Sequence, residues 1–168
     1  MLKDTKKIAV VGVGAVGSYL GAFLTREGHD VTLIDMWGIH VDTMKRDGLK
    51  VTGCQGDFDV VVNPVHLTDA INIQDKFDII LLAVKSYDTE WAAHFSKRLL
   101  ANDGVIVSNQ NCMNDSLIGE INQFSKETTS RAKYYRDQLS IPLTDILSLW
   151  SGVRAGVEHL VHLVKRKK

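Results

Sequence analysis

Lys7-Ile8-Ala9-Val10-Val11-Gly12-Val13-Gly14-Ala15-Val16-Gly17-Ser18-Tyr19-Leu20-Gly21 is the stretch that decides the fold of this chain. An apolar run of strand length, rich in β-branched residues, leads directly into three glycines spaced Gly-x-Gly-x-x-Gly. The residues from Ala15 to Arg26 have the composition of a helix. The pattern therefore predicts a strand, a tight turn and a helix.

This order gives each glycine a separate task in a dinucleotide-binding turn. Gly12 lets the chain turn off the strand, Gly14 leaves room for a pyrophosphate, and Gly17 lets the helix pack close to the strand. The pyrophosphate would lie on the free N–H groups at the positive end of the helix. The alternative is an ordinary glycine-rich loop. The cofactor-binding residues expected here are Gly12, Val13, Gly14, Ala15, Val16 and Gly17.

An acidic residue follows at the distance that such a site needs. Glu27-Gly28-His29-Asp30 stops the helix, and Val31-Thr32-Leu33-Ile34-Asp35 reads as a second strand. Asp35 is placed to accept hydrogen bonds from the adenosine ribose. Its carboxylate would repel a 2′-phosphate, which favours NAD(H) over NADP(H). The alternative is that Asp35 caps the helix starting near Trp37.

Composition excludes several classes of function. The 168 residues are 45% apolar and 24% charged, which fits a globular protein, and the formal charge of zero gives no electrostatic case for nucleic acid or an anionic membrane. The first apolar run breaks at Gly12, too early for a signal peptide or a membrane span, so we expect a cytoplasmic protein. Cys54 and Cys112 lack metal-ligand spacing, and Glu158, His159 and His162 read as a solvated helix face. No metal site is expected.

The middle of the chain predicts a hairpin and then a buried strand. Residues 49–52 and 57–62 read as two strands of an inserted hairpin, which Asn63-Pro64 should end. Residues 77–85 read as a strand that is uniformly apolar from Ile79 to Val84, as a central parallel strand would be, and that ends on Lys85. Ligands bind beyond the carboxyl ends of such strands, so Lys85 is a candidate cation near a nicotinamide or an acidic substrate. Strand-end lysines also commonly just reach solvent.

The next helix and strand lead to the same edge. A helix is expected from Ser86 to about Ala101, and its Trp91, Phe95 and Leu99 share one face, which we interpret as core packing and not as an aromatic binding site. Residues 104–108 read as a strand that delivers Asn109-Gln110-Asn111 to this edge. Three side-chain amides there suit a polar substrate, and turn formation explains them equally well.

Three motifs in this order resemble the 2-dehydropantoate 2-reductase (ketopantoate reductase) family. They are Gly12 to Gly21, then Leu82-Ala83-Val84-Lys85-Ser86-Tyr87-Asp88-Thr89, and then Ser108-Asn109-Gln110-Asn111-Cys112-Met113-Asn114. The family has glycine where this chain has Cys112. The resemblance covers about residues 7 to 122 and implies an α/β fold of Rossmann type: a doubly wound, mainly parallel sheet, here with a helical C-terminal appendage.

The resemblance also implies an activity. The family transfers a hydride from a nicotinamide cofactor, generally NADPH, to the ketone of a 2-oxo acid. NADP(H) is thus the alternative to the NAD(H) that Asp35 favours. By their motif positions, Val84, Lys85 and Asn111 are expected at the cofactor, and Lys85 and Asn111 also at the substrate. The expected function is an NAD(P)H-dependent oxidoreductase acting on 2-dehydropantoate or a related 2-oxo acid.

The remaining residues depart from the family. Its members carry a second, helical domain with a general-acid lysine, and residues 123–168 are too few to contain that domain intact. The lysine position would fall on Asp137. We therefore expect a dinucleotide-binding domain at 1–122 and a helical tail at 123–168, whose apolar face from Ile146 to Val164 would pack on the body or on a second copy of the chain. The alternative function is a catalytically incomplete NAD(P)-binding module that associates through this tail.

Overall fold

The computed structural model describes residues 5–52, 56–110, 117–118 and 121 of the chain. The predicted tail at 123–168, its helix and the association expected through it lie outside these residues, as do Asn111 and Cys112. In chain order the elements are β1 (Lys7–Val11), α1 (Ala15–Arg26), β2 (Asp30–Asp35), α2 (Gly38–Asp47), β3 (Leu49–Val51), β4 (Phe58–Val60), β5 (Asn63–His66), η1 (Asp69–Asn72), β6 (Phe77–Leu82), η2 (Ser86–Asp88), α3 (Thr89–Leu99) and β7 (Leu100–Ser108).

Five of the strands form one parallel sheet in the order β5-β2-β1-β6-β7. The chain leaves β1 toward β2 and β5 on one side and returns to β6 and β7 on the other, which makes the β1–β6 boundary the topological switch point of a Rossmann-type fold. The predicted α/β fold class is confirmed. Ligands of such sheets bind at this boundary, beyond the carboxyl ends of the strands.

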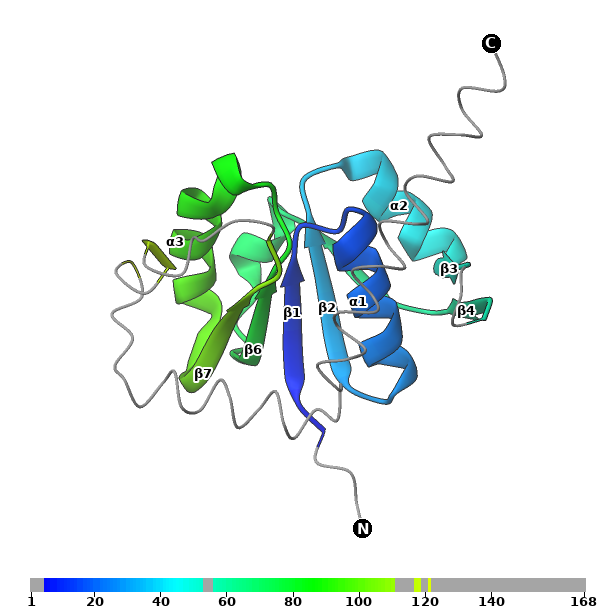
Figure 1. The fold of residues 1–168 in the computed structure, drawn as a ribbon, viewed down its shortest axis with the longest axis horizontal. Helices are drawn as coiled ribbons and strands as arrows, with labels where there is room; N and C mark the ends of the chain where they lie inside the picture. The colour runs from blue at the N-terminus through cyan, green and yellow to red at the C-terminus, as the bar shows by residue number, and fades with distance from the viewer. Residues whose placement is uncertain (1–4, 53–55, 111–116, 119–120, 122–168) are drawn as a thin grey trace.

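Alternating residues of β1 face the two layers of helices. Ile8 and Val10 pack with α1 and α2, whereas Ala9 and Val11 pack with α3. Both sets are fully or almost fully buried, which explains why β1 is apolar without interruption. Figure 1 shows α1 and α2 on one side of the sheet and α3 on the other. The sheet is therefore doubly wound, as predicted.

The predicted hairpin exists, but its end was misjudged. β3 and β4 pair antiparallel apart from the main sheet. The Arg26 guanidinium of α1 lies 4.3 Å from the ring centroid of Phe23 and 4.2 Å from that of Phe58, so it links α1 to the hairpin by cation–π contacts. Asn63-Pro64 does not stop the chain; it begins β5, which pairs with β2 at the edge of the sheet. The hairpin already ends at Val60, and because proline is tolerated in edge strands, the dipeptide belongs to a further strand that the sequence did not predict.

Other boundaries moved by a few residues. β6 ends at Leu82, so Lys85 lies in the connection to α3 and not at the end of the strand itself. β7 begins at Leu100, and its pairing with β6 is irregular between Leu100 and Val105. No helix in the described part of the chain is long and apolar enough to cross a membrane.

Candidate functional site

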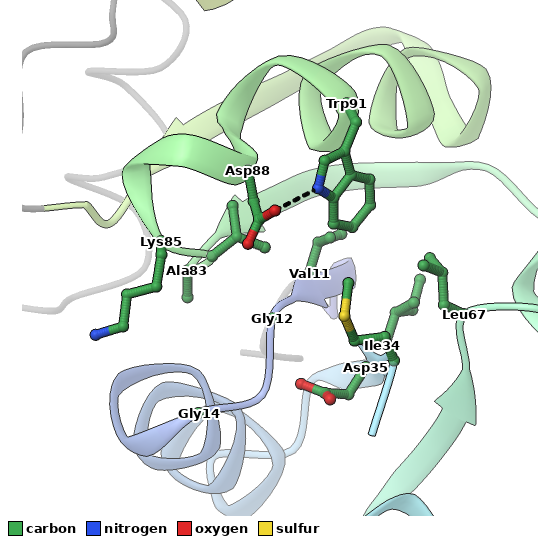
Figure 2. A pocket seen from close by; sticks show the side chains of 12 residues that line it. Val11, Gly12, Gly14, Ile34, Asp35, Leu67, Ala83, Lys85, Asp88 and Trp91 are labelled. Carbon is green, nitrogen blue, oxygen red and sulfur yellow. Dashed lines mark hydrogen bonds between the residues drawn. The ribbon is translucent and has the colours of Figure 1, made fainter. Parts of the chain in front are cut away.

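A pocket opens at the carboxyl ends of the sheet, at the switch point between β1 and β6. Residues from β1, β2, β5 and β6 or the turns that follow them meet there with one edge of α3 (Figure 2). The lining residues are Val11, Gly12, Gly14, Ile34, Asp35, Met36, Leu67, Ala83, Val84, Lys85, Asp88 and Trp91. The topology thus brings Gly12, Gly14, Asp35, Val84 and Lys85 together, as the sequence predicts.

The three motif glycines have three different environments. Gly12 has φ +91°, a conformation that L side chains rarely adopt, and a Cβ there would also meet Val84 at 2.8 Å. A Cβ on Gly17 would stand 2.0 Å from the carbonyl oxygen of Gly12, so α1 packs directly on the turn. A Cβ on Gly14 would meet nothing within 4 Å and this residue lines the pocket. Of the three motif glycines, only Gly14 borders open space that a ligand could fill, whereas Gly12 and Gly17 are packed against protein atoms.

Val13 lies between Gly12 and Gly14, and its peptide groups are held from three sides. Its N–H donates to Asp35 Oδ2 at 2.6 Å. Its carbonyl accepts from Ser18 Oγ at 3.0 Å and from His40 Nε2 at 2.9 Å. Because a carbonyl only accepts, Nε2 of His40 carries the proton. The buried Val13 side chain packs into the core with α1 and α2, so the turn is fixed by β2, α1 and α2 together.

Asp35 ends β2 with both carboxylate oxygens engaged. Oδ2 accepts from Val13, and Oδ1 accepts from the N–H of Trp37 at 2.8 Å, just before α2 begins. The contact with Trp37 agrees with the capping alternative, and the contact with Val13 adds a link to the glycine turn. The half-buried side chain still lines the pocket. A ligand hydroxyl that approached there would meet an oriented acceptor.

On the other side of the pocket, Lys85 is exposed, and its side chain extends outward, away from Asp88, Trp91 and Leu67 (Figure 2). Within the described residues its ammonium forms no ion pair. Beside it, Asp88 Oδ1 accepts a hydrogen bond from Trp91 Nε1 at 2.9 Å and both side chains line the pocket. Interpreting Trp91 as core alone was therefore incomplete, because one indole both packs against α3 neighbours and borders the pocket.

Several residues at the pocket or the glycine turn were not predicted as site residues, among them Met36, Leu67, Asp88 and His40. Leu67 follows β5, the strand that was not predicted, and its N–H donates to the carbonyl of Asp35 at 2.8 Å. Met36 directly follows Asp35, so its place after the second strand was available as a signal. His40 had no such signal, because only the approach of α2 to the turn brings it to Val13.

The other predicted residues that the structure describes lie at the start of α1 and just after β7. Ala15 and Val16 begin α1 immediately after Gly14, where the N–H groups of a first helical turn are free of intrahelical partners. Gln110, one of the three predicted amides, turns toward the β6–α3 connection. Asn111 lies outside the described residues. Among the described residues, no group of three or more His, Cys, Asp or Glu side chains could hold a metal ion.

Known proteins are similar to this chain in sequence and in fold. The family model described as ketopantoate reductase PanE/ApbA matches residues 8–122. The 2-dehydropantoate 2-reductase of Aquifex aeolicus is 34% identical over 105 residues, which are 62% of this chain and 31% of that protein. A PanE/ApbA family ketopantoate reductase from Ralstonia eutropha superposes with a TM-score of 0.60 at 32% identity, covering 70% of this chain and 38% of that one.

A second solved structure is the ternary complex of D-mandelate dehydrogenase with NADH and anilino(oxo)acetate. It matches with a TM-score of 0.59 at 29% identity, covering 68% of this chain and 36% of that one. This chain therefore spans about a third of the length of the relatives that it matches.

Proposed function

This chain belongs to the ketopantoate reductase PanE/ApbA family, and we propose that its pocket binds NAD(H) for the reduction of a 2-oxo acid of the ketopantoate type. The observation that carries the proposal is the glycine turn, in which Gly14 borders open space while Gly12 and Gly17 are packed against the protein. The NADH complex of the structural relative D-mandelate dehydrogenase supports the same class of cofactor.

The residues fit a dinucleotide in the order expected for this fold. Gly14, Ala15 and Val16 would present backbone N–H groups to the pyrophosphate at the start of α1. Gly12, Val13 and Gly17 would hold the shape of the turn. Bound NADH would supply the hydride that reduces the ketone carbon of the substrate.

The carboxylate of Asp35 favours NAD(H) over NADP(H). This carboxylate already accepts hydrogen bonds from the N–H of Val13, in the glycine turn, and from the N–H of Trp37, just before α2. A 2′-phosphate would need such donors, and it would also meet a negative charge. The ribose hydroxyls of NAD(H), in contrast, can donate to that carboxylate.

Lys85, Asn111 and Val84 would border the nicotinamide and the substrate. An ammonium at Lys85 can attract the carboxylate of a 2-oxo acid or a cofactor phosphate, because it is exposed at the pocket and not paired within the described residues. The alkoxide formed by hydride transfer must then gain a proton, a step that general acids typically accelerate about 10²–10⁴-fold. None of the residues described at the pocket is assigned as that acid.

Titration of the chain with NADH and NADPH tests the proposal, followed by assays with 2-dehydropantoate and other 2-oxo acids. We expect tighter binding of NADH, and failure of both cofactors to bind would refute the site. Tighter binding of NADPH would overturn the role of Asp35 alone. Binding without turnover would instead indicate the catalytically incomplete module.

Lys85→Ala tests the other side of the pocket. Removing the ammonium should weaken NADH binding several-fold, about 1 kcal/mol, and the loss should shrink in high salt. Lys97→Ala, which changes an exposed lysine of α3, is the matched control. Equal affinities for Lys85→Ala and the wild type would remove Lys85 from the site.

A further inference from the structure

The side chain of Gln110 joins the end of β7 to the connection between β6 and α3. Its Nε2 lies 3.0 Å from the carbonyl oxygen of Val84, 3.3 Å from that of Lys85 and 2.8 Å from Thr89 Oγ1. Carbonyls only accept, so the nitrogen must face them. Its Oε1 accepts from Ser108 Oγ at 3.2 Å. Gln110 therefore points into the protein, where its amide contacts two backbone carbonyls and two hydroxyl groups.

These contacts hold both ends of the turn that carries Lys85. Thr89 Oγ1 donates to the carbonyl of Ser86 at 2.8 Å, so its remaining capacity is to accept from Gln110. Asp88 N–H donates to the Lys85 carbonyl at 2.9 Å and closes the turn from within. One amide thus reaches the residue before Lys85, Lys85 itself and the first residue of α3.

A lysine side chain is flexible, so the region that its ammonium can reach is set by the position of its backbone. The Lys85 ammonium is exposed and has no ion pair among the described residues, whereas the Lys85 carbonyl is held by Gln110 and by the N–H of Asp88. Adjacent to this contact, the N–H of Asn109 donates to the carbonyl of Leu82 at 2.8 Å, so the ends of β6 and β7 are tied twice. The amide of Gln110 is the part of this tie that reaches Lys85.

We propose that Gln110 is a positioning residue that fixes the turn from Val84 to Thr89 and so holds the backbone of Lys85 at the pocket, from where its ammonium can reach bound NADH. This inference rests on the proposed function, since Lys85 acts there on NADH. In this role Gln110 acts on protein groups, namely the carbonyls of Val84 and Lys85 and the hydroxyls of Thr89 and Ser108. Its effect must pass through Lys85.

The test is the salt dependence of NADH binding in a double-mutant cycle. Gln110→Met keeps the length of the side chain and removes the amide, and Lys85→Ala removes the charge. Each should raise the Kd for NADH several-fold at low salt and flatten its rise with NaCl, because the lost contact is electrostatic. In the double variant the effects should not add, since both remove one interaction. Gln110→Glu, with the same shape, should behave like Gln110→Met because its carboxylate would face two carbonyls.

Gln74→Met is the matched control, because Gln74 is exposed and donates only to the carbonyl of Asn72 at 3.4 Å among the bonds described. It should leave both the Kd and its salt dependence unchanged. Additive effects, or a Gln110→Met variant with the salt dependence of the wild type, would overturn the positioning role while NADH still binds. A wild type that binds no NADH would overturn the proposed function, and this inference with it.

Discussion

On the β1–β2 side of the pocket the polar groups of Val13 and Asp35 bond to each other, whereas on the β6–β7 side the Lys85 ammonium ends in solvent. The first side is set by side chains from β2, α1 and α2. On the second side, Gln110 holds the backbone of Val84 and Lys85 through their carbonyls. The β1–β2 side of the pocket is therefore already shaped by hydrogen bonds in the described chain, whereas the β6–β7 side offers a charge on a side chain that no described ion pair holds.

The largest expected effect comes from Gly17→Ala, which distorts the glycine turn on the β1–β2 side of the pocket. A Cβ 2.0 Å from the Gly12 oxygen must push α1 off the turn. Overpacking of this kind costs about 3 kcal/mol, and the melting temperature should fall by roughly 10 °C. Thermal unfolding followed by circular dichroism measures it. An unchanged melting temperature would show that α1 packs less closely than described.

Gly14→Ala separates binding from folding on the same turn. Its Cβ would enter open space and its φ of −74° suits alanine, so stability should stay as in the wild type. The methyl group would occupy the path of the pyrophosphate, and the Kd for NADH should rise about 30-fold, or 2 kcal/mol. Fluorescence titration measures the Kd. Gly38→Ala is the control, because a Cβ there meets only His66 at 3.9 Å; equal affinities for both variants would remove Gly14 from the site.

Asp35→Asn tests the cofactor preference. An amide offers one accepting oxygen where the carboxylate offers two, so the N–H of Val13 or that of Trp37 loses its partner. The Kd for NADH should rise about 10-fold, or 1.4 kcal/mol, and the Kd for NADPH should change less. Asp30→Asn, at the exposed opposite end of β2, is the matched control. A preference for NADH that survives Asp35→Asn contradicts the role of the carboxylate.

His40→Ala should have the smallest effect. Val13 keeps Ser18 as a donor to its carbonyl, so only one of two hydrogen bonds is lost, worth about 1 kcal/mol. A loss of about 1 kcal/mol corresponds to a threefold to fivefold rise in the Kd for NADH. His94→Ala, on the exposed face of α3, is the control. A loss as large as that of Gly14→Ala would mean that His40 touches the cofactor itself.

Local patterns predicted the parts of the site that lie close in sequence. The apolar run of β1, the glycine spacing and Asp35 at the end of β2 each follow from a short stretch, and the structure joins them. Pro64 misled the prediction because proline usually ends a strand, and only its place at the sheet edge permits β5.

The contacts that were missed depend on tertiary approach. His40 meets Val13 across 27 residues, and Gln110 meets Val84 across 26. No spacing rule connects such pairs. The motif around Gln110 was recognised for its amides, but whether an amide faces a substrate or a backbone carbonyl depends on how β7 ends beside β6.

The three hydrogen bonds to the Val13 peptide groups have a consequence for the entropy of binding. Ordering a residue of flexible backbone costs roughly 1–2 kcal/mol of conformational entropy. At this turn that entropy is lost when the protein folds, because β2, α1 and α2 fix Val13 before any ligand arrives. A ligand that meets the turn therefore finds it already ordered, and the contact energy gained there goes into affinity.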